Sequence, residues 1–302
     1  MLSPSYIDQF VQYLKFEKRY SVHTIRSYHD DLVQFFDFLQ AQFELSDPAL
    51  DKIPATYIRS WLASLKEHKA TAKTINRKIS SLKSFFKYYM RIGKLELTPM
   101  TDITSPKIPK RLPNYVEQKD TGTLFDYVEF PDNWTGKTDR LILEIFYHTG
   151  MRLSELVNLK ESQVSLAGGD KSTLKILGKG NKERILPVGK KLADAIRDYL
   201  TAKKALPEYD KTYLLVNEKG KHLYEKYVYR VVKKYLSHVT TIEKKSPHVL
   251  RHTFATHLTN NGADLNAIKE LLGHSSLAAT QVYTHNTIGK LKDIYQKAHP
   301  KA

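Results

Sequence analysis

Six side chains of this 302-residue chain have types and an order that suit chemistry on a phosphodiester. In chain order they are Arg152, Lys179, His248, Arg251, His274 and Tyr283. Arginines can neutralise the non-bridging oxygens of a phosphodiester, histidine and lysine can move protons, and a tyrosine oxygen can attack phosphorus. Together these groups could break and reseal a phosphodiester bond without a metal ion.

Each of these residues also has an ordinary structural explanation when it is taken alone. His248 and Arg251 share one face of a predicted helix, where capping or an ion pair would account for both. His252 and His257 raise the question of zinc, but no HExxH pattern or cysteine accompanies them, so we expect packing or capping roles. The turn around Lys179 lacks the GxxxxGK[ST] spacing of a phosphate loop. The combination therefore carries the prediction.

The composition indicates a basic globular protein that contacts a polyanion. Lys and Arg number 48 against 32 Asp and Glu, and residues 1–110 already carry 17 basic against 11 acidic side chains. A solubilising surface charge is the alternative explanation. The absence of cysteine excludes disulfides, thiolate metal sites and cysteine nucleophiles. No apolar run has the length of a signal-peptide core or a membrane span, so we expect a cytoplasmic protein with no membrane partner.

The first hundred residues are predicted to form four helices. The first has an apolar stripe of Phe10, Val11, Leu14 and Phe16, and the second begins after a predicted N-cap at Ser21. A third is expected over about 55–68, and the fourth follows Thr71 or Thr74. The fourth is expected to bury Ile75, Ile79, Leu82, Phe85, Phe86 and Tyr89 and to present Asn76, Arg77, Lys78, Lys83 and Lys87 on its other, solvent-facing side.

Residues 104–114 contain three prolines and three basic residues, a composition that predicts an extended linker between domains 1–103 and 115–302. In the second domain we expect short strands at 174–177 and 185–188, joined by a hairpin through Gly178–Asn181. The predicted helices are 141–149, one beginning at Arg152, 190–204, 223–237, 247–260, 265–272 between an Asp264 cap and Gly273, a short one carrying Tyr283, and a tail helix of about 287–298.

Several segments, in this order, resemble the tyrosine recombinase (phage integrase) family, and most nearly the bacterial Xer site-specific recombinases. In the second domain they are 149–156 (TGMRLSEL), 177–184 (LGKGNKER), 248–257 (HVLRHTFATH), 272–276 (LGHSS) and 283–285 (YTH). In the first domain, 20–28 (YSVHTIRSY) and 74–82 (TINRKISSL) resemble the core-binding helices of that family. The stretches 130–137 and 167–171 differ from the common family pattern.

The resemblance implies a mainly α fold with a small β-sheet, in which a four-helix, SAM-like core-binding domain precedes an α+β catalytic domain. It implies a cofactor-free reaction in which Tyr283 forms a 3′-phosphotyrosyl bond, His248 accepts a proton and Lys179 protonates the leaving 5′ oxygen. Arg152, Arg251 and His274 would bind the phosphate oxygens, and Glu155 would orient Arg152 or a histidine. Residues expected to contact DNA are Thr24, Arg26, Asn76, Arg77, Lys78 and Lys83.

The partners implied by the resemblance are double-stranded DNA with a specific recombination site and a homo- or hetero-tetramer on that DNA. A paralogous recombinase and a septum DNA translocase are further expected partners, with chromosome dimer resolution at cell division as the expected role. The resemblance implies that the tail helix is exchanged between subunits in the tetramer. The apolar stripe of this helix by itself favours packing on its own domain; the stripe consists of Ile288, Leu291, Ile294 and Tyr295.

Four other functions are considered. Integration of a mobile element uses the same chemistry, and a type IB-like topoisomerase uses similar residues without a tetramer or a defined target site. A DNA-binding architectural protein without activity would not be expected to keep the complete set of six residues. A metal-dependent transposase or nuclease would need metal ligands, and it would be sensitive to EDTA.

Overall fold

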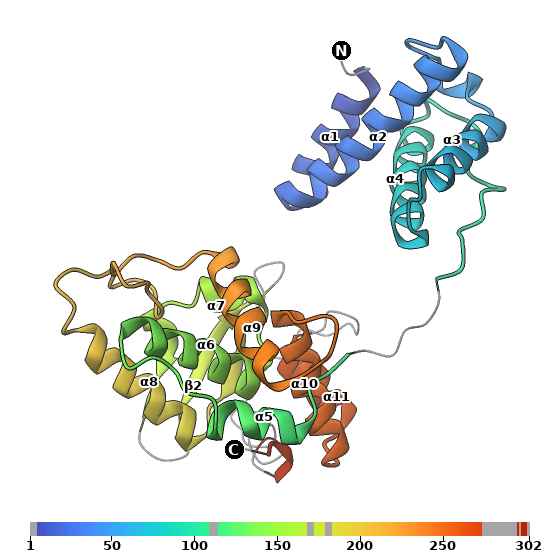
Figure 1. Cartoon of the computed structure of the whole chain (residues 1–302). Coiled ribbons are helices and arrows are strands. Elements are labelled where there is room, and N and C mark those ends of the chain that lie inside the picture. The colour runs from blue at the N-terminus through green and yellow to red at the C-terminus, as the bar shows by residue number, and fades with distance from the viewer. Residues whose placement is uncertain are drawn as a thin grey trace. The chain divides into compact units, whose positions relative to one another are not determined.

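The computed structural model describes residues 5–108, 114–167, 172–178, 183–273, 295 and 297–300. The chain divides into two compact units, 1–111 and 112–302, and each has its own hydrophobic core. The described part is mostly helical with one small sheet, as the sequence predicted (Figure 1).

The first unit contains four α-helices and a short 3₁₀ helix. They are α1 (Ser5–Phe16), α2 (Val22–Phe43), the 3₁₀ helix Leu50–Lys52, α3 (Ala55–Glu67) and α4 (Ala72–Arg91). The side chains of Ser21 and Thr71 accept hydrogen bonds from the backbone N–H of Thr24 and Thr74 respectively, so they are the N-caps of α2 and α4. The expected buried face of α4 is confirmed, because all six predicted residues lie in the core.

Two predictions about side chains in this unit are wrong. Phe16 is 63% exposed, because it is the last residue of α1, and Ile7 is buried with Phe10 and Leu14 instead. Lys78 was expected on the solvent-facing side of α4, but it is 4% exposed. Its ammonium group donates to Asp31 of α2 at 2.9 Å, and this buried carboxylate holds it inside the unit.

The second unit is built around α6. Its helices are α5 (Gln118–Asp126), α6 (Trp134–Thr149), α7 (Leu153–Val157), the 3₁₀ helix Glu161–Gln163, α8 (Lys190–Lys203), α9 (Glu225–Val239), α10 (Pro247–Asn260) and α11 (Leu265–Leu272). α6 packs against α8, α9 and α10. It begins at Trp134, earlier than predicted, because the Asn133 side chain accepts a hydrogen bond from the Gly136 N–H at 2.9 Å.

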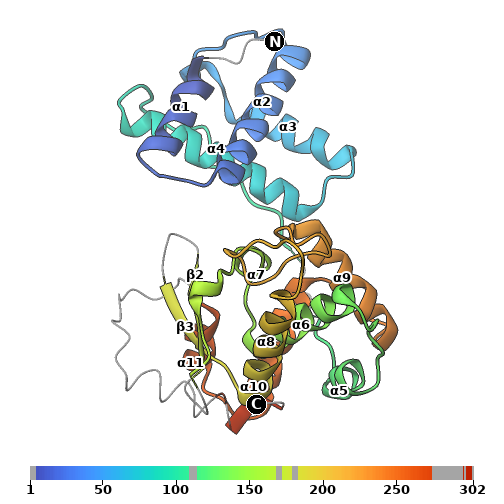
Figure 2. The same ribbon diagram turned by 90° about the vertical axis from the view of Figure 1, so that its left-hand side faces the viewer.

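The sheet has three antiparallel strands in the order β1 (Val164–Ser165), β2 (Thr173–Leu177) and β3 (Glu183–Pro187). The hairpin of β2 and β3 was predicted, whereas β1 was not; with only two residues, it is too short to show an alternating pattern. Figure 2 shows β3 beside α11, and these two elements are in contact. Ile176 of β2 is paired with Arg184 of β3 in the register.

The described residues of the C-terminal tail pack on the second unit. Tyr295, Ala298 and His299 are buried. The Tyr295 hydroxyl shares a hydrogen bond of 3.0 Å with Nδ1 of His148, and Asn261 donates to the Ala298 carbonyl at 2.6 Å. Tyr295 thus lies on the buried side of the tail. The remainder of the predicted tail helix and the helix expected around Tyr283 lie outside the described residues.

Candidate active site

Arg152 is positioned by a sharp corner between α6 and α7. Gly150 ends α6 with a φ of +59°, and a Cβ atom at this position would come within 2.5 Å of Phe254, so glycine is required. Arg152 is the N-cap of α7, and its backbone N–H donates to Oε2 of Glu155 at 2.7 Å. This capping box starts the helix and places the Arg152 side chain beside the Glu155 carboxylate.

The carboxylate of Glu155 is buried and accepts hydrogen bonds from two guanidinium groups. Nη1 of Arg152 donates to Oε1 at 2.8 Å, while Nη1 and Nη2 of Arg184 donate to Oε1 and Oε2 at 2.9 and 2.7 Å. Burial by itself would raise the pKa of Glu155, but the hydrogen bonds and charge of Arg184, with the hydrogen bonds of Arg152, lower it to about 2. Glu155 is therefore ionised at neutral pH, and it orients Arg152 as expected.

Three arginines bind three consecutive backbone carbonyls at the end of α11. Nε of Arg184 donates to the Leu271 carbonyl at 3.0 Å, Nη2 of Arg251 to the Leu272 carbonyl at 2.6 Å, and Nη2 of Arg152 to the Gly273 carbonyl at 3.2 Å. The C-terminal end of a helix carries partial negative charge and has carbonyls without intrahelical partners, so it attracts cations. The end of α11 thus gathers side chains from the N-cap of α7, from β3 and from α10.

Arg251 lies on α10 and is 4% exposed. Its Nη1 donates to the Gly150 carbonyl at 2.8 Å, so it also braces the corner that precedes Arg152. Burial lowers the pKa of Arg251 to about 10, and repulsion from the charge of Arg152 is the second cause of this shift. Among the described residues it has no carboxylate within ion-pair distance. The site therefore carries an excess of positive charge in poorly solvated surroundings, an arrangement that attracts an anion.

His248 lies one turn before Arg251 on α10, and its ring meets that of His252 at a centroid distance of 4.5 Å. Burial and the neighbouring positive charges lower the pKa of His248, so the ring is neutral at pH 7 and can accept a proton. His257 is a packing residue, as expected: its Nε2 is 2.9 Å from the Val116 carbonyl oxygen. No group of three potential metal ligands occurs within the described part of the chain.

Comparison with known proteins identifies the family. The phage integrase family profile matches residues 114–289, and the profile of the phage integrase N-terminal SAM-like domain matches residues 7–93. The chain belongs to the phage integrase family. It is 38% identical over 302 residues to tyrosine recombinase XerC of Thermodesulfovibrio yellowstonii, with 98% of this chain and 96% of the relative covered. It is 39% identical to tyrosine recombinase XerC of Staphylococcus saprophyticus, with 97% and 96% covered.

The fold is also that of solved recombinases. The XerH site-specific recombinase, solved in a post-cleavage complex with its palindromic difH substrate, superposes with a TM-score of 0.71 at 23% identity, covering 99% of this chain and 82% of the other. The expected family, fold class and enzyme class are confirmed: this member of the phage integrase family is a site-specific tyrosine recombinase of the Xer type. No described helix of this recombinase is long and apolar enough to cross a membrane.

The structure describes three of the six predicted catalytic residues of this recombinase. Arg152 and Arg251 meet at the end of α11, with His248 one turn away from Arg251. Lys179, His274 and Tyr283 lie outside the described residues, and their assignment stays a prediction. Sequence reasoning missed the role of Arg184, although its place in the LGKGNKER segment, at the start of a strand beside Lys179, was a signal for it.

The assignment of the residues predicted to contact DNA stays a prediction. Arg77 pairs with Asp31, whereas Thr24 lies in the first turn of α2, about two helical turns (roughly 10 Å) from Asp31. Asn76 donates to the Pro106 carbonyl at 2.9 Å. The side chain of Arg26 is 80% exposed and Lys83 is also exposed, so both are free of the core. Lys78 is buried, so it is not placed to contact DNA as predicted.

A basic face of α9 was also missed. Its exposed residues Lys226, Tyr229, Arg230 and Lys233 recur at helical spacing on the side opposite the buried valines. Arg230 also donates to the Tyr224 hydroxyl at 2.7 Å. The same spacing is visible in the sequence, and it could have been found there.

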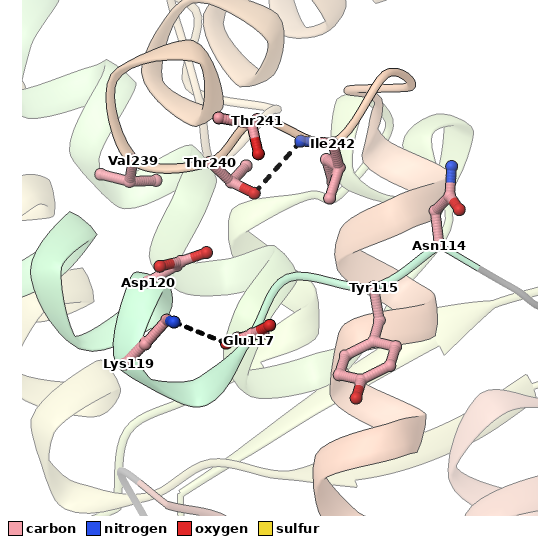
Figure 3. A pocket seen from close by; sticks show the side chains of 9 residues that line it. All are labelled: Asn114, Tyr115, Glu117, Lys119, Asp120, Val239, Thr240, Thr241 and Ile242. Atoms are coloured by element: carbon pink, nitrogen blue, oxygen red, sulfur yellow. Dashed lines mark hydrogen bonds and ion pairs between the residues drawn. The ribbon is translucent and has the colours of Figure 1, made fainter.

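A cavity of about 430 Å³ lies elsewhere in the second unit, between the start of α5 and the loop after α9 (Figure 3). Its lining includes the carboxylates of Glu117 and Asp120 and one lysine, Lys119, which pairs with Glu117 at 3.0 Å. None of the arginines at the end of α11 lines it. This cavity is therefore distinct from the arginine site. The net negative charge of its lining would also repel a phosphate.

Proposed function

We propose that Arg152 and Arg251 bind the non-bridging oxygens of one DNA phosphodiester and that Tyr283 attacks its phosphorus. The observation that supports this most directly is the convergence of guanidinium groups on Glu155 and the end of α11. The contacts named above use two of the five N–H groups of Arg152 and two of those of Arg251. The remaining donors can bind the charge that develops on a phosphate during attack.

The chemical step is a transfer of phosphorus from a sugar oxygen to a tyrosine oxygen. As the Tyr283 oxygen bonds to phosphorus, its proton passes to His248, whose lowered pKa keeps it neutral and ready to accept. The bond from phosphorus to the 5′ oxygen breaks, and Lys179 gives that oxygen a proton. His274 donates a hydrogen bond to the phosphate. The product is a 3′-phosphotyrosyl bond, which a 5′ hydroxyl of the exchange partner reverses, so no cofactor is consumed.

We infer that the enzyme acts as a homo- or hetero-tetramer on double-stranded DNA with a specific site, in the cytoplasm, to resolve chromosome dimers at cell division. The support is the identity with proteins named XerC and the likeness to a recombinase solved on its DNA substrate. A paralogous recombinase and a septum DNA translocase are the further partners of this role. In the tetramer, residues of about 287–298 would be exchanged between subunits; the contacts of Tyr295 with His148 would then form across the interface.

DNA would contact both units. In the first, domain 1–103 would use Thr24, Arg26, Asn76, Arg77 and Lys83. In the second, domain 115–302, the basic face of α9 would add phosphate contacts, since its lysine and arginine side chains reach solvent. The two would be joined by the linker 104–114.

The decisive test uses a nicked duplex from the replication-terminus region of the source genome, which traps a covalent intermediate. The wild-type protein should form a denaturant-stable adduct in EDTA, and Tyr283→Phe should form none while binding the duplex as tightly as the wild type. An adduct with Tyr283→Phe would assign the nucleophile to another residue. Dependence of the adduct on a divalent metal would favour a nuclease.

A further inference from the structure

Arg184 is a buried arginine whose hydrogen bonds are directed at the protein itself. It lies on β3 and is 4% exposed, so it is not placed to contact DNA. Its two terminal nitrogens bind the two oxygens of Glu155 in a paired arrangement, and Nε binds the Leu271 carbonyl. Paired hydrogen bonds of this kind fix the relative orientation of a guanidinium and a carboxylate.

The partners of Arg184 belong to the segments that carry the proposed chemistry. Glu155 binds Arg152 directly. Leu271 is three residues before His274 in the chain, and Arg184 itself is five residues after Lys179. Arg184 is paired with Ile176 in the register of β2 and β3, which fixes the backbone of the arginine in the sheet. One side chain thus connects the strand that follows Lys179, the capping box of Arg152 and the helix that precedes His274.

We propose that Arg184 acts in recombination as a positioning residue. It orients Arg152 through Glu155, and it anchors the end of α11 that leads to His274. This inference rests on the proposed function of the arginine site. Gly273 supports it, because a Cβ at that position would lie 3.1 Å from Cδ and Nη1 of Arg184. The glycine that ends α11 therefore also leaves room for the guanidinium.

A purely structural ion pair is the alternative. Buried ion pairs are often weak contributors to stability, yet removing one partner is strongly destabilising. A structural role would reduce the amount of folded protein, whereas a positioning role would slow cleavage by the protein that remains folded. The two can therefore be separated by rates measured per folded molecule.

Lys203 provides a matched control in the same unit. It is 1% exposed, and its ammonium group binds Glu161 at 2.6 Å and the Tyr213 carbonyl at 2.5 Å. Like Arg184, it is a buried cation that joins a carboxylate to a backbone carbonyl, but none of its partners binds Arg152 or α11. Lys203→Met should lower stability and leave the cleavage rate per folded molecule unchanged.

The experiment measures single-turnover adduct formation on the nicked duplex with full-length Arg184→Gln and Arg184→Lys, and the folded fraction by circular dichroism. Both variants should cleave about 100-fold more slowly per folded molecule, the cost of a small displacement of a group in the reaction site, with DNA affinity unchanged. Lysine should not rescue, because a single ammonium group cannot form the paired contact. If Arg184→Gln fails to fold, the lysine variant carries the test.

Two further comparisons test whether the effect passes through Arg152. Adding Arg184→Gln to Arg152→Ala should slow cleavage by much less than Arg184→Gln does alone, since the part of its effect that passes through Arg152 is already lost. A methylphosphonate at the scissile position lacks the charge that Arg152 binds, so the defect of Arg184→Gln should shrink on it. Wild-type rates per folded molecule, or independent losses in the double variant, would overturn the inference. Failure of the proposed function would give a different result, because the wild-type protein itself would then form no adduct. That result would also overturn the inference about Arg184.

Discussion

Replacing Glu155 by glutamine tests whether one buried carboxylate holds the arginine site together. The side chain is 4% exposed, and it accepts hydrogen bonds from the guanidinium groups of Arg152 and Arg184. Glutamine has nearly the same shape, but it replaces one acceptor oxygen by an NH₂ group that would face arginine donors. The change therefore removes the charge and one acceptor while it leaves the packing in place.

The expected loss of stability follows from the pKa of Glu155. The folded protein lowers it from 4.5 to about 2. This difference corresponds to about 3 kcal/mol of stability for the ionised form. Removal of one partner from a buried ion pair typically costs about 3–5 kcal/mol. We therefore expect Glu155→Gln to lower the free energy of unfolding of the second unit by about 3–4 kcal/mol at neutral pH.

The effect should depend on pH in a defined direction. Because the folded pKa is depressed, the contribution of Glu155 is complete above the unfolded pKa of 4.5 and is lost as the pH falls towards about 2. At about pH 3.5 the parent protein should have lost about 1 kcal/mol of this contribution, so the difference in stability between parent and variant should narrow by that amount.

Urea unfolding can be followed through Trp134, which lies in α6 and donates to the Asn217 carbonyl at 2.9 Å. Trp61, the other tryptophan, is replaced by phenylalanine in parent and variant alike. Glu144→Gln is the control, because Glu144 pairs with a half-exposed Arg140 on the surface and should cost less than about 1 kcal/mol. A loss for Glu155→Gln as small as that of the control, or one that does not change with pH, would refute the reasoning.

Three further predictions concern other parts of the chain. Gly150→Ala should lower the melting temperature of the second unit and cost about 2–4 kcal/mol, since its Cβ would collide with Phe254 at a positive φ. Asp31→Asn should destabilise the first unit by about 3–5 kcal/mol in thermal unfolding, because it leaves the Lys78 ammonium buried without a carboxylate. Burial lowers the pKa of His299 from 6.5 to about 4, so its stabilising effect is complete above 6.5 and is lost as the pH falls through that range. The protection of the C-terminal amides, which is their exchange rate corrected for the intrinsic rate at each pH, should decrease accordingly between pH 7 and 5, and His299→Phe should abolish this decrease; constant protection in the wild type would contradict the prediction.

Much of the local structure could be predicted from the sequence, because its causes lie within a few residues. Ser21 and Asp264 each cap a helix with an oxygen that reaches N–H groups two or three positions away. Gly273 ends α11 with a left-handed φ, as a glycine after an apolar helix predicts. The alternating and helical spacings likewise predicted the hairpin and the buried face of α4.

Contacts between distant segments could be identified only from the tertiary structure. Lys78 looks like a solvated residue on a basic face, and only the approach of Asp31, 47 residues earlier in the chain, explains why it is buried. Arg184 looks like an ordinary polar residue on a strand, until Glu155 and Leu271 meet its guanidinium from 29 and 87 residues away.

The sequence by itself determined which chemical groups are present, their order, and the local elements that carry Arg152, His248 and Arg251. The packing of α11 against β3 and α10 decided how those groups are oriented, because it brings three backbone carbonyls at a helix end to three arginines. Spacing along a chain describes neighbours on one element, whereas the direction of a guanidinium depends on acceptors that folding brings from other elements.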